Sequence, residues 1–122
     1  MKGFVLVIDD DEDVRITTAE ILELLDVESL EAESGVEGLK LYEEYSESIV
    51  VIILDLSMPG MSGAETLQEL RRMNLQIPVI VSSGYSEHQI HELLDGFSGI
   101  EFLAKPYEVE SFIEMLMKHF PK

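Results

Sequence analysis

The chain alternates between short apolar runs and longer segments with helical periodicity, and this alternation restricts the fold more than any other feature. Continuous apolar runs rich in β-branched residues occupy positions 4–8, 49–54 and 79–81, and a weaker run occupies 100–103. Runs this short and continuous are typical of parallel strands that are buried on both faces. Residues 27–32 alternate between polar and apolar side chains, which predicts a strand at the edge of the sheet.

Between these runs, apolar residues recur at the three- and four-residue spacing of an amphipathic helix. The three clearest stripes are Val14, Thr18, Ile21, Leu22 and Leu25; Ile90, Leu93, Leu94 and Phe97; and Val109, Phe112, Ile113, Leu116 and Phe120. Capping-box patterns begin at Ser34, Ser62 and Ser86, each with Glu or Gln three residues later. Strands that alternate with helices predict a flavodoxin-like (βα)5 fold, a doubly wound parallel sheet with strand order 2-1-3-4-5.

Length and composition limit the class of protein. A chain of 122 residues that is 46% hydrophobic predicts a single domain covering residues 1–122. It has no apolar stretch of about 18 residues and no basic, apolar leader at its start, so we expect a cytoplasmic protein without membrane contact. Cysteine is absent, and the net charge is −17, which argues against direct contact with nucleic acid or anionic lipid.

Polar side chains follow several of the predicted strands where each strand ends. Asp9 and Asp10 follow the first, Asp55 the third, Ser83 the fourth and Lys105 the fifth. Carboxyl ends of parallel strands meet at one edge of a sheet, so we expect these groups to converge. Two carboxylates 4 Å apart repel by roughly 4 kcal/mol at an effective dielectric constant of 20, so a proton or a cation is needed among them. Hard oxygen ligands beside an open pocket suit Mg²⁺.

The acids that come next have a simpler interpretation. Residues 11–13 are all acidic and precede a helical stripe, and acids favour the first turn of a helix. The spacing of Asp9 and the acids after it, up to Glu20, also resembles an EF-hand calcium loop. That alternative has Val14 where the loop needs glycine, and it follows a strand-like run, so we disfavour it.

Taken together, four motifs resemble those of two-component response-regulator receiver domains. They are VLVIDDDE, VIILDLSMPGMSG, PVIVSSGYS and FLAKPY, and they occur in order and at suitable spacing over essentially the whole chain. Within them, the segments SSGYSE and GIEFLAKPY are more similar to receivers attached to hybrid sensor histidine kinases. The resemblance implies a phosphoacceptor domain of a phosphorelay. Such a domain catalyses its own phosphorylation and dephosphorylation and is not otherwise an enzyme, although a parent protein could be a histidine kinase.

The resemblance also implies roles for the converging residues. Asp55 would be the phosphoacceptor, which receives a phosphoryl group from a histidine kinase or a histidine phosphotransfer domain. Asp10, Asp55 and the backbone carbonyl of Ser57 would bind Mg²⁺, or Mn²⁺, directly, and Asp9 would bind it through water. Lys105 would pair with the phosphoryl oxygens.

Further roles concern switching and the lifetime of the phosphoryl group. By the same resemblance, Ser83 would hydrogen-bond the phosphoryl group, and Phe102 would rotate into the space that Ser83 vacates. Ser57 and Tyr85 match positions that flank the path of the hydrolytic water, and we hypothesise that Tyr85 obstructs this path. The face around the fourth and fifth strand–helix units would then change. A homodimer, if one forms, is expected to pair through the fourth helix, fifth strand and fifth helix.

Other interpretations remain to be tested. One is a pseudo-receiver that binds partners without phosphorylation. Another is a phosphatase with an aspartyl nucleophile, but such enzymes carry a second Asp where this chain has Ser57. His88 and His91 are expected at the surface without an evident carboxylate partner.

Overall fold

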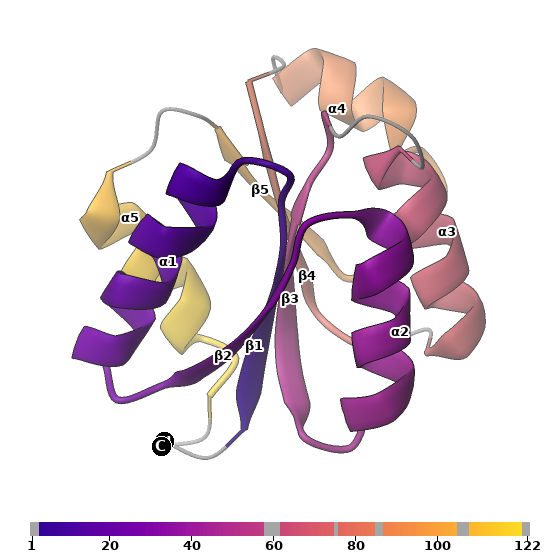
Figure 1. Cartoon of the computed structure of the whole chain (residues 1–122). Helices are drawn as coiled ribbons and strands as arrows, with labels where there is room; N and C mark the ends of the chain where they lie inside the picture. The colour runs from indigo at the N-terminus through magenta and orange to yellow at the C-terminus, as the bar shows by residue number, and fades with distance from the viewer. Residues whose placement is uncertain (1–2, 58–61, 75, 85–86, 105–107, 121–122) are drawn as a thin grey trace.

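In the computed structural model the described residues, 3–57, 62–74, 76–84, 87–104 and 108–120, form a parallel sheet with helices on both faces (Figure 1). The sheet has the strand order β2-β1-β3-β4-β5, as the sequence predicts. The elements in chain order are β1 (Phe4–Ile8), α1 (Glu12–Leu24), β2 (Glu28–Ala32), α2 (Gly35–Tyr45), β3 (Ile49–Asp55), α3 (Gly63–Met73), β4 (Val79–Ser83), α4 (Glu87–Leu93), β5 (Ile100–Ala104) and α5 (Val109–Met117).

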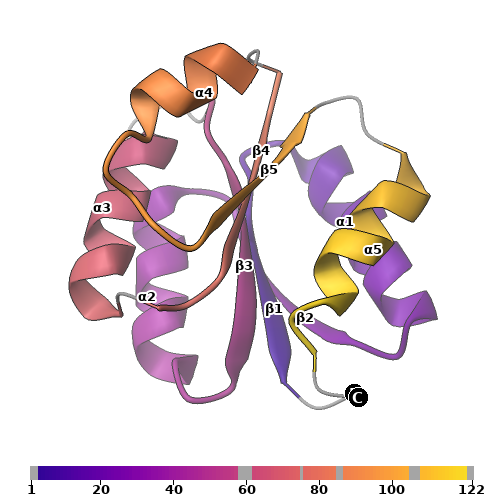
Figure 2. The same ribbon diagram turned by 180° about the vertical axis from the view of Figure 1, so that it is seen from behind.

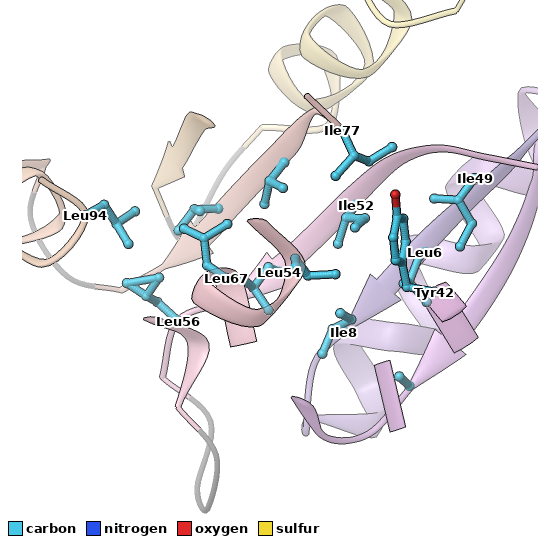
Figure 3. Close-up of a cluster of buried hydrophobic side chains, with 14 of the residues drawn as sticks. Leu6, Ile8, Tyr42, Ile49, Ile52, Leu54, Leu56, Leu67, Ile77 and Leu94 are labelled. Carbon is cyan, nitrogen blue, oxygen red and sulfur yellow. The ribbon is translucent and has the colours of Figure 1, made fainter. Parts of the chain in front are cut away.

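The sheet separates two apolar cores. Helices α1 and α5 cover one face, and α2 and α3 cover the other, with α4 beside α3 at the carboxyl ends of the strands (Figures 1 and 2). On the α2/α3 side, Ile8 and Leu54 pack with Tyr42 and Leu67 (Figure 3). On the α1/α5 side, the fully buried Phe112 is the largest side chain. Burial of central strands on both faces explains why their sequences are continuously apolar.

All five strands lie where the sequence predicts them, but three extend further. β3 includes Asp55, β4 includes Ser83 and β5 includes Ala104, because backbone pairing continues past the predicted ends. The helical stripes extend beyond three of the helices, and Leu25 of the first stripe is the C-cap of α1. Phe97 follows the end of α4 and Phe120 follows the end of α5, although both still pack against the cores. Val109 is half exposed because it lies in the first turn of α5.

The predicted helix starts are partly confirmed. Ser62 and Glu65 form a reciprocal capping box at the start of α3. Ser34 accepts a hydrogen bond from Glu37 N, which caps α2. The third pattern, at Ser86, lies outside the described residues.

The acids after the first strand begin α1. Asp11 is the N-cap of α1 and accepts hydrogen bonds from Asp13 N (2.9 Å) and Val14 N (3.4 Å). Glu12 and Asp13 then lie in the first turn, where they favour the helix dipole. Since Glu12–Leu24 is a continuous helix, the region that an EF-hand loop would need is not a loop.

A buried arginine ties α3 to the chain that leads into β5. Arg71 is 7% exposed, and its guanidinium donates to the backbone carbonyls of Ile77 (2.8 Å), Ser98 (2.8 Å) and Gly99 (3.3 Å). Burial lowers the pKa of the Arg71 guanidinium, and Tyr42 opposes this effect. Arginine nevertheless stays charged in proteins, so carbonyl oxygens compensate this buried charge.

In the part of the chain that the structure describes, no helix combines the length and apolar character needed to cross a membrane.

Candidate functional site

Three carboxylates converge at the carboxyl ends of β1 and β3. Asp9 and Asp10 follow β1, and Asp55 is the last residue of β3. Each offers one carboxylate oxygen, and these three oxygens all lie within 4.8 Å of one another. Asp9 and Asp55 are buried (3% and 5% exposed), whereas Asp10 is exposed. The structure thus brings together the three acids that the sequence places at one edge of the sheet.

Backbone amides orient two of these carboxylates. Ser57 N donates to Asp55 Oδ1 (3.0 Å), and Asp11 N donates to Asp9 Oδ1 (2.9 Å). Both contacts span two residues, so each acid forms a tight turn directly after its strand. The first turn of α3 packs against the same strand end, since a Cβ on Gly63 would lie 2.7 Å from Asp55 O. Such close packing of α3 restricts movement of the strand end that carries Asp55.

Arg15 on α1 supports the first strand end, and sequence reasoning missed it. Its Nη1 donates to the backbone carbonyl of Asp9 (2.6 Å), and its Nε lies 3.9 Å from Glu31 Oε1. Its side chain is only 13% exposed. The sequence feature that could have pointed to Arg15 is its position just after a run of acids. The sequence alone does not show that its partner is a backbone carbonyl.

The donor set fits a small divalent cation. Mg²⁺ binds oxygen at about 2.1 Å, so two oxygens on one ion lie at most about 4.2 Å apart. The three carboxylate oxygens lie within 4.8 Å of one another, so small side-chain rotations would bring them to about 4.2 Å or less. Carboxylates at this separation repel one another, and a divalent cation offsets that repulsion. Asp9, Asp10 and Asp55 are therefore suitable Mg²⁺ ligands in chemical type, and the backbone carbonyl of Ser57, two residues after Asp55 in the sequence, is a hard oxygen donor of the same kind.

Two buried serines end β4 beside this cluster. Ser82 is 2% exposed and pairs with Asp55 across the sheet, and Ser83 is fully buried. Within the part of the chain that the structure describes, Ser82 Oγ has no hydrogen-bond partner. A buried hydroxyl in that state costs about 1–3 kcal/mol. The sequence drew attention to Ser83 and not to Ser82.

Phe102 on β5 lies on the same face of the sheet as Ser83. Its register partner on β4 is Val81, two residues before Ser83, and side chains two residues apart share a face. Phe102 is partly buried and lines a pocket of about 230 Å³ between α4 and β5, together with Ile90 and Leu94. The predicted site residues Lys105 and Tyr85 lie outside the described residues.

Two histidines have carboxylate partners. His88 Nε2 lies 3.0 Å from Glu92 Oε1, so the expectation that it lacks such a partner is wrong; one turn of helix brings residues four apart together. His119 and Lys118 both contact the carboxylate of Glu101 on β5. Burial alone would raise the pKa of Glu101, but the hydrogen bonds from Lys118 and His119 outweigh it and lower the pKa.

Comparison with known families identifies the arrangement. A family model described as the response regulator receiver domain matches residues 5–117. The chain belongs to this family. Receiver domains act in two-component signalling, where they interact with histidine kinases or phosphotransfer proteins, and they bind Mg²⁺ at an acidic pocket.

Individual relatives agree with this membership. This chain is 33% identical to the sensor kinase CckA of Brucella abortus over 118 residues. The matched region covers 93% of this chain and 12% of that kinase. The chain therefore spans only a small part of that relative. A crystal structure of the receiver domain of the hybrid histidine kinase CckA superimposes with a TM-score of 0.82 at 30% identity, covering 98% of this chain and all of that one.

A second solved structure carries ligands. The response regulator TrrA of Thermotoga maritima, solved in complex with Mg²⁺ and a beryllium fluoride, has a TM-score of 0.82 at 28% identity, covering 97% of this chain and 99% of that chain. These likenesses show the flavodoxin-like receiver fold for this chain.

Proposed function

We propose that this receiver domain accepts a phosphoryl group on Asp55 in a Mg²⁺-dependent reaction. The observation that carries the proposal is the carboxylate cluster, in which Asp55 ends a buried strand with its oxygen within 4.8 Å of those of Asp9 and Asp10. The donor is a phosphohistidine on a histidine kinase or on a histidine phosphotransfer domain. The backbone amide of Ser57 holds the Asp55 carboxylate in a fixed orientation, which favours attack on a bound donor.

The transfer is a displacement at phosphorus. A carboxylate oxygen of Asp55 forms a bond to phosphorus while the phosphorus–nitrogen bond of the donor breaks. The imidazole nitrogen keeps the electron pair of that bond and takes up a proton. Bound Mg²⁺ supplies positive charge that neutralises the phosphoryl oxygens. Asp10, Asp55 and the Ser57 carbonyl would hold it directly, Asp9 would hold it through water, and Mn²⁺ could take its place.

Two further residues act on the attached phosphoryl group. Lys105 pairs with its oxygens, and the Ser83 hydroxyl donates to one of them. When Ser83 moves toward the phosphoryl group, Phe102 turns into the vacated space. The pocket of about 230 Å³ beside Phe102 supports this step, because it gives a partly buried ring room to change rotamer. A partner then recognises the changed face of α4 and β5, and a second copy can pair through α4, β5 and α5.

Mass spectrometry of the intact protein tests the proposal. After incubation with acetyl phosphate and Mg²⁺, we expect one added phosphoryl group per chain, and none when EDTA replaces Mg²⁺. The absence of any gain would favour a pseudo-receiver that acts without phosphorylation. Continuous release of phosphate over many turnovers would favour a phosphatase.

The metal site itself can be tested without phosphorylation. Mg²⁺ at 100 times its dissociation constant should raise the free energy of unfolding by about 2.7 kcal/mol. The variant Asp10→Asn should lose most of this response. Without Mg²⁺ it should be more stable than wild type by on the order of 1 kcal/mol, because one of three like charges is gone and water screens the exposed side chain. Urea unfolding with and without Mg²⁺ measures both effects.

The matched control for this experiment is Asp13→Asn, the same chemical change in the first turn of α1. This variant should keep the Mg²⁺ response and lose about 0.3–1 kcal/mol of stability, because Asp13 favours the helix dipole. An Asp10→Asn protein that responds to Mg²⁺ as wild type does would remove Asp10 from the proposed ligands.

Tyr85 is proposed to prolong the phosphorylated state by obstructing the hydrolytic water. Replacement by Ala should speed the decay of the aspartyl phosphate, because the smaller side chain opens the path of the water. The decay is measured by removing the phosphodonor and following the mass of the protein with time, with Ser57→Ala as a comparison on the other side of the path. An unchanged decay rate in Tyr85→Ala would contradict this role.

A further inference from the structure

Ser82 on β4 carries a buried hydroxyl that the roles proposed above leave unused. Its backbone pairs in register with Asp55 on β3 and with Leu103 on β5. Register partners in a parallel ladder carry their side chains on the same face of the sheet. Ser82 is therefore the nearest residue to Asp55 on the next strand, at the same level and on the same face.

Burial identifies which face this is. Asp55 lies two residues after Ile53, and Ser82 lies two residues after Ile80; both isoleucines belong to the core beneath α1 and α5. Ser83 is one residue further along β4, so its side chain starts from the opposite face. The two serines thus have different surroundings, and Ser82 is the one that shares a face with the phosphoacceptor.

The hydroxyl of Ser82 is buried without compensation in this state of the protein. Ser82 is 2% exposed, and none of the described residues forms a hydrogen bond with its Oγ. The residues before it on β4, Val79, Ile80 and Val81, are apolar, and an apolar residue here would avoid the cost of a buried hydroxyl. Of its two neighbours at this level, Leu103 has no polar side-chain atom, whereas Asp55 has two acceptor oxygens.

We propose that Ser82 is a positioning residue for the phosphoacceptor, whose hydroxyl donates to a side-chain oxygen of Asp55 when Asp55 is phosphorylated. This inference rests on the proposed function. Formation of the phosphorus–oxygen bond uses one carboxylate oxygen of Asp55 and leaves the other as a carbonyl acceptor. Neighbouring strands lie about 4.8 Å apart, so a change of one Ser82 rotamer and a small movement of Asp55 bring the donor and this acceptor within hydrogen-bond distance.

The test compares Ser82→Thr with Ser82→Val. These two side chains have nearly the same shape and differ in the hydroxyl. With acetyl phosphate and Mg²⁺, the Val variant should be phosphorylated about tenfold more slowly than the Thr variant, because it lacks the hydrogen bond that forms to this oxygen during transfer; tenfold corresponds to about 1.4 kcal/mol, the size of one hydrogen bond. The Thr variant should react at a rate close to that of wild type.

A second measurement does not depend on phosphoryl transfer. Without ligands, the Val variant should have a higher Tm than the Thr variant, because it lacks the uncompensated hydroxyl. Addition of Mg²⁺ and beryllofluoride, which mimics the phosphoryl group, should raise the Tm of the Thr variant more than that of the Val variant. If the role of Ser82 were merely structural, the two variants would differ in Tm without ligands but would show the same rise in Tm with Mg²⁺ and beryllofluoride.

The outcomes separate this inference from the proposed function. A wild-type chain that gains no phosphoryl group overturns both. A wild-type chain that is phosphorylated, with Thr and Val variants that share the same rate and the same beryllofluoride shift, overturns the role of Ser82 alone. If the larger side chains prevent folding, Ser82→Ala against wild type provides the same comparison.

Discussion

Asp55→Asn is expected to abolish phosphorylation while the fold stays intact. The amide keeps an oxygen that can accept the hydrogen bond from Ser57 N, which lies 3.0 Å from Asp55 Oδ1. It no longer offers a charged oxygen that can attack phosphorus, so no phosphoryl group should be gained from acetyl phosphate and Mg²⁺. Mass spectrometry of the intact protein measures the gain, and circular dichroism verifies the fold.

The stability of the same variant provides a second, independent signal. Two carboxylate charges at 4.8 Å repel by about 3.5 kcal/mol at an effective dielectric constant of 20. Because Asp55→Asn removes one charge from this cluster, the variant should be at least as stable as wild type when Mg²⁺ is absent. A loss of phosphorylation therefore cannot be attributed to unfolding.

Asp13→Asn is again the control, because Asp13 is an exposed acid close in sequence to the cluster but in the first turn of α1. It should be phosphorylated as wild type is. If Asp55→Asn gained a phosphoryl group to the wild-type extent, another side chain would be the acceptor and the proposed function would be wrong.

The fold and the acidic cluster could be predicted because both follow from local patterns. The strand runs are continuous in sequence, and parallel pairing brings their carboxyl ends to one edge of the sheet. Ile8 pairs with Leu54, so the residues that follow them, Asp9 and Asp55, necessarily become neighbours. Knowledge of strand order alone was enough to place these carboxylates together.

The supporting contacts could not be predicted, because they join residues whose sequence separation carries no pattern. Arg71 donates to Ser98 O, 27 residues away, and Arg15 donates to Asp9 O, six residues away. The acceptors are backbone carbonyls, which every residue has, so the identity of the partner leaves no trace in the sequence. For Ser82 the sequence shows a serine at the end of a strand, but the missing partner is visible only in three dimensions.

The contacts of Arg71 lead to the other large expected effect, a loss of stability in Arg71→Met. Methionine keeps much of the apolar stem but donates no hydrogen bonds. The buried carbonyl of Ile77 would then lose its donor at 2.8 Å, while the carbonyls of Ser98 and Gly99, on exposed residues, can turn to water. We expect a decrease of about 2–4 kcal/mol in the free energy of unfolding, which sums the unsatisfied carbonyl and the lost packing.

Arg72→Met is the matched control, since it removes the neighbouring guanidinium from the surface. Arg72 is 67% exposed and pairs with Glu69 at 3.0 Å, one turn earlier on α3. An exposed pair of this kind contributes about 0–1 kcal/mol, so urea unfolding should separate the two variants clearly. Equal losses in both would contradict the structural role of Arg71.

Because Ser98 and Gly99 lead directly into β5, Arg71→Met should also loosen the strand that carries Phe102, and hydrogen exchange of the β5 amides should then increase more than that of β1.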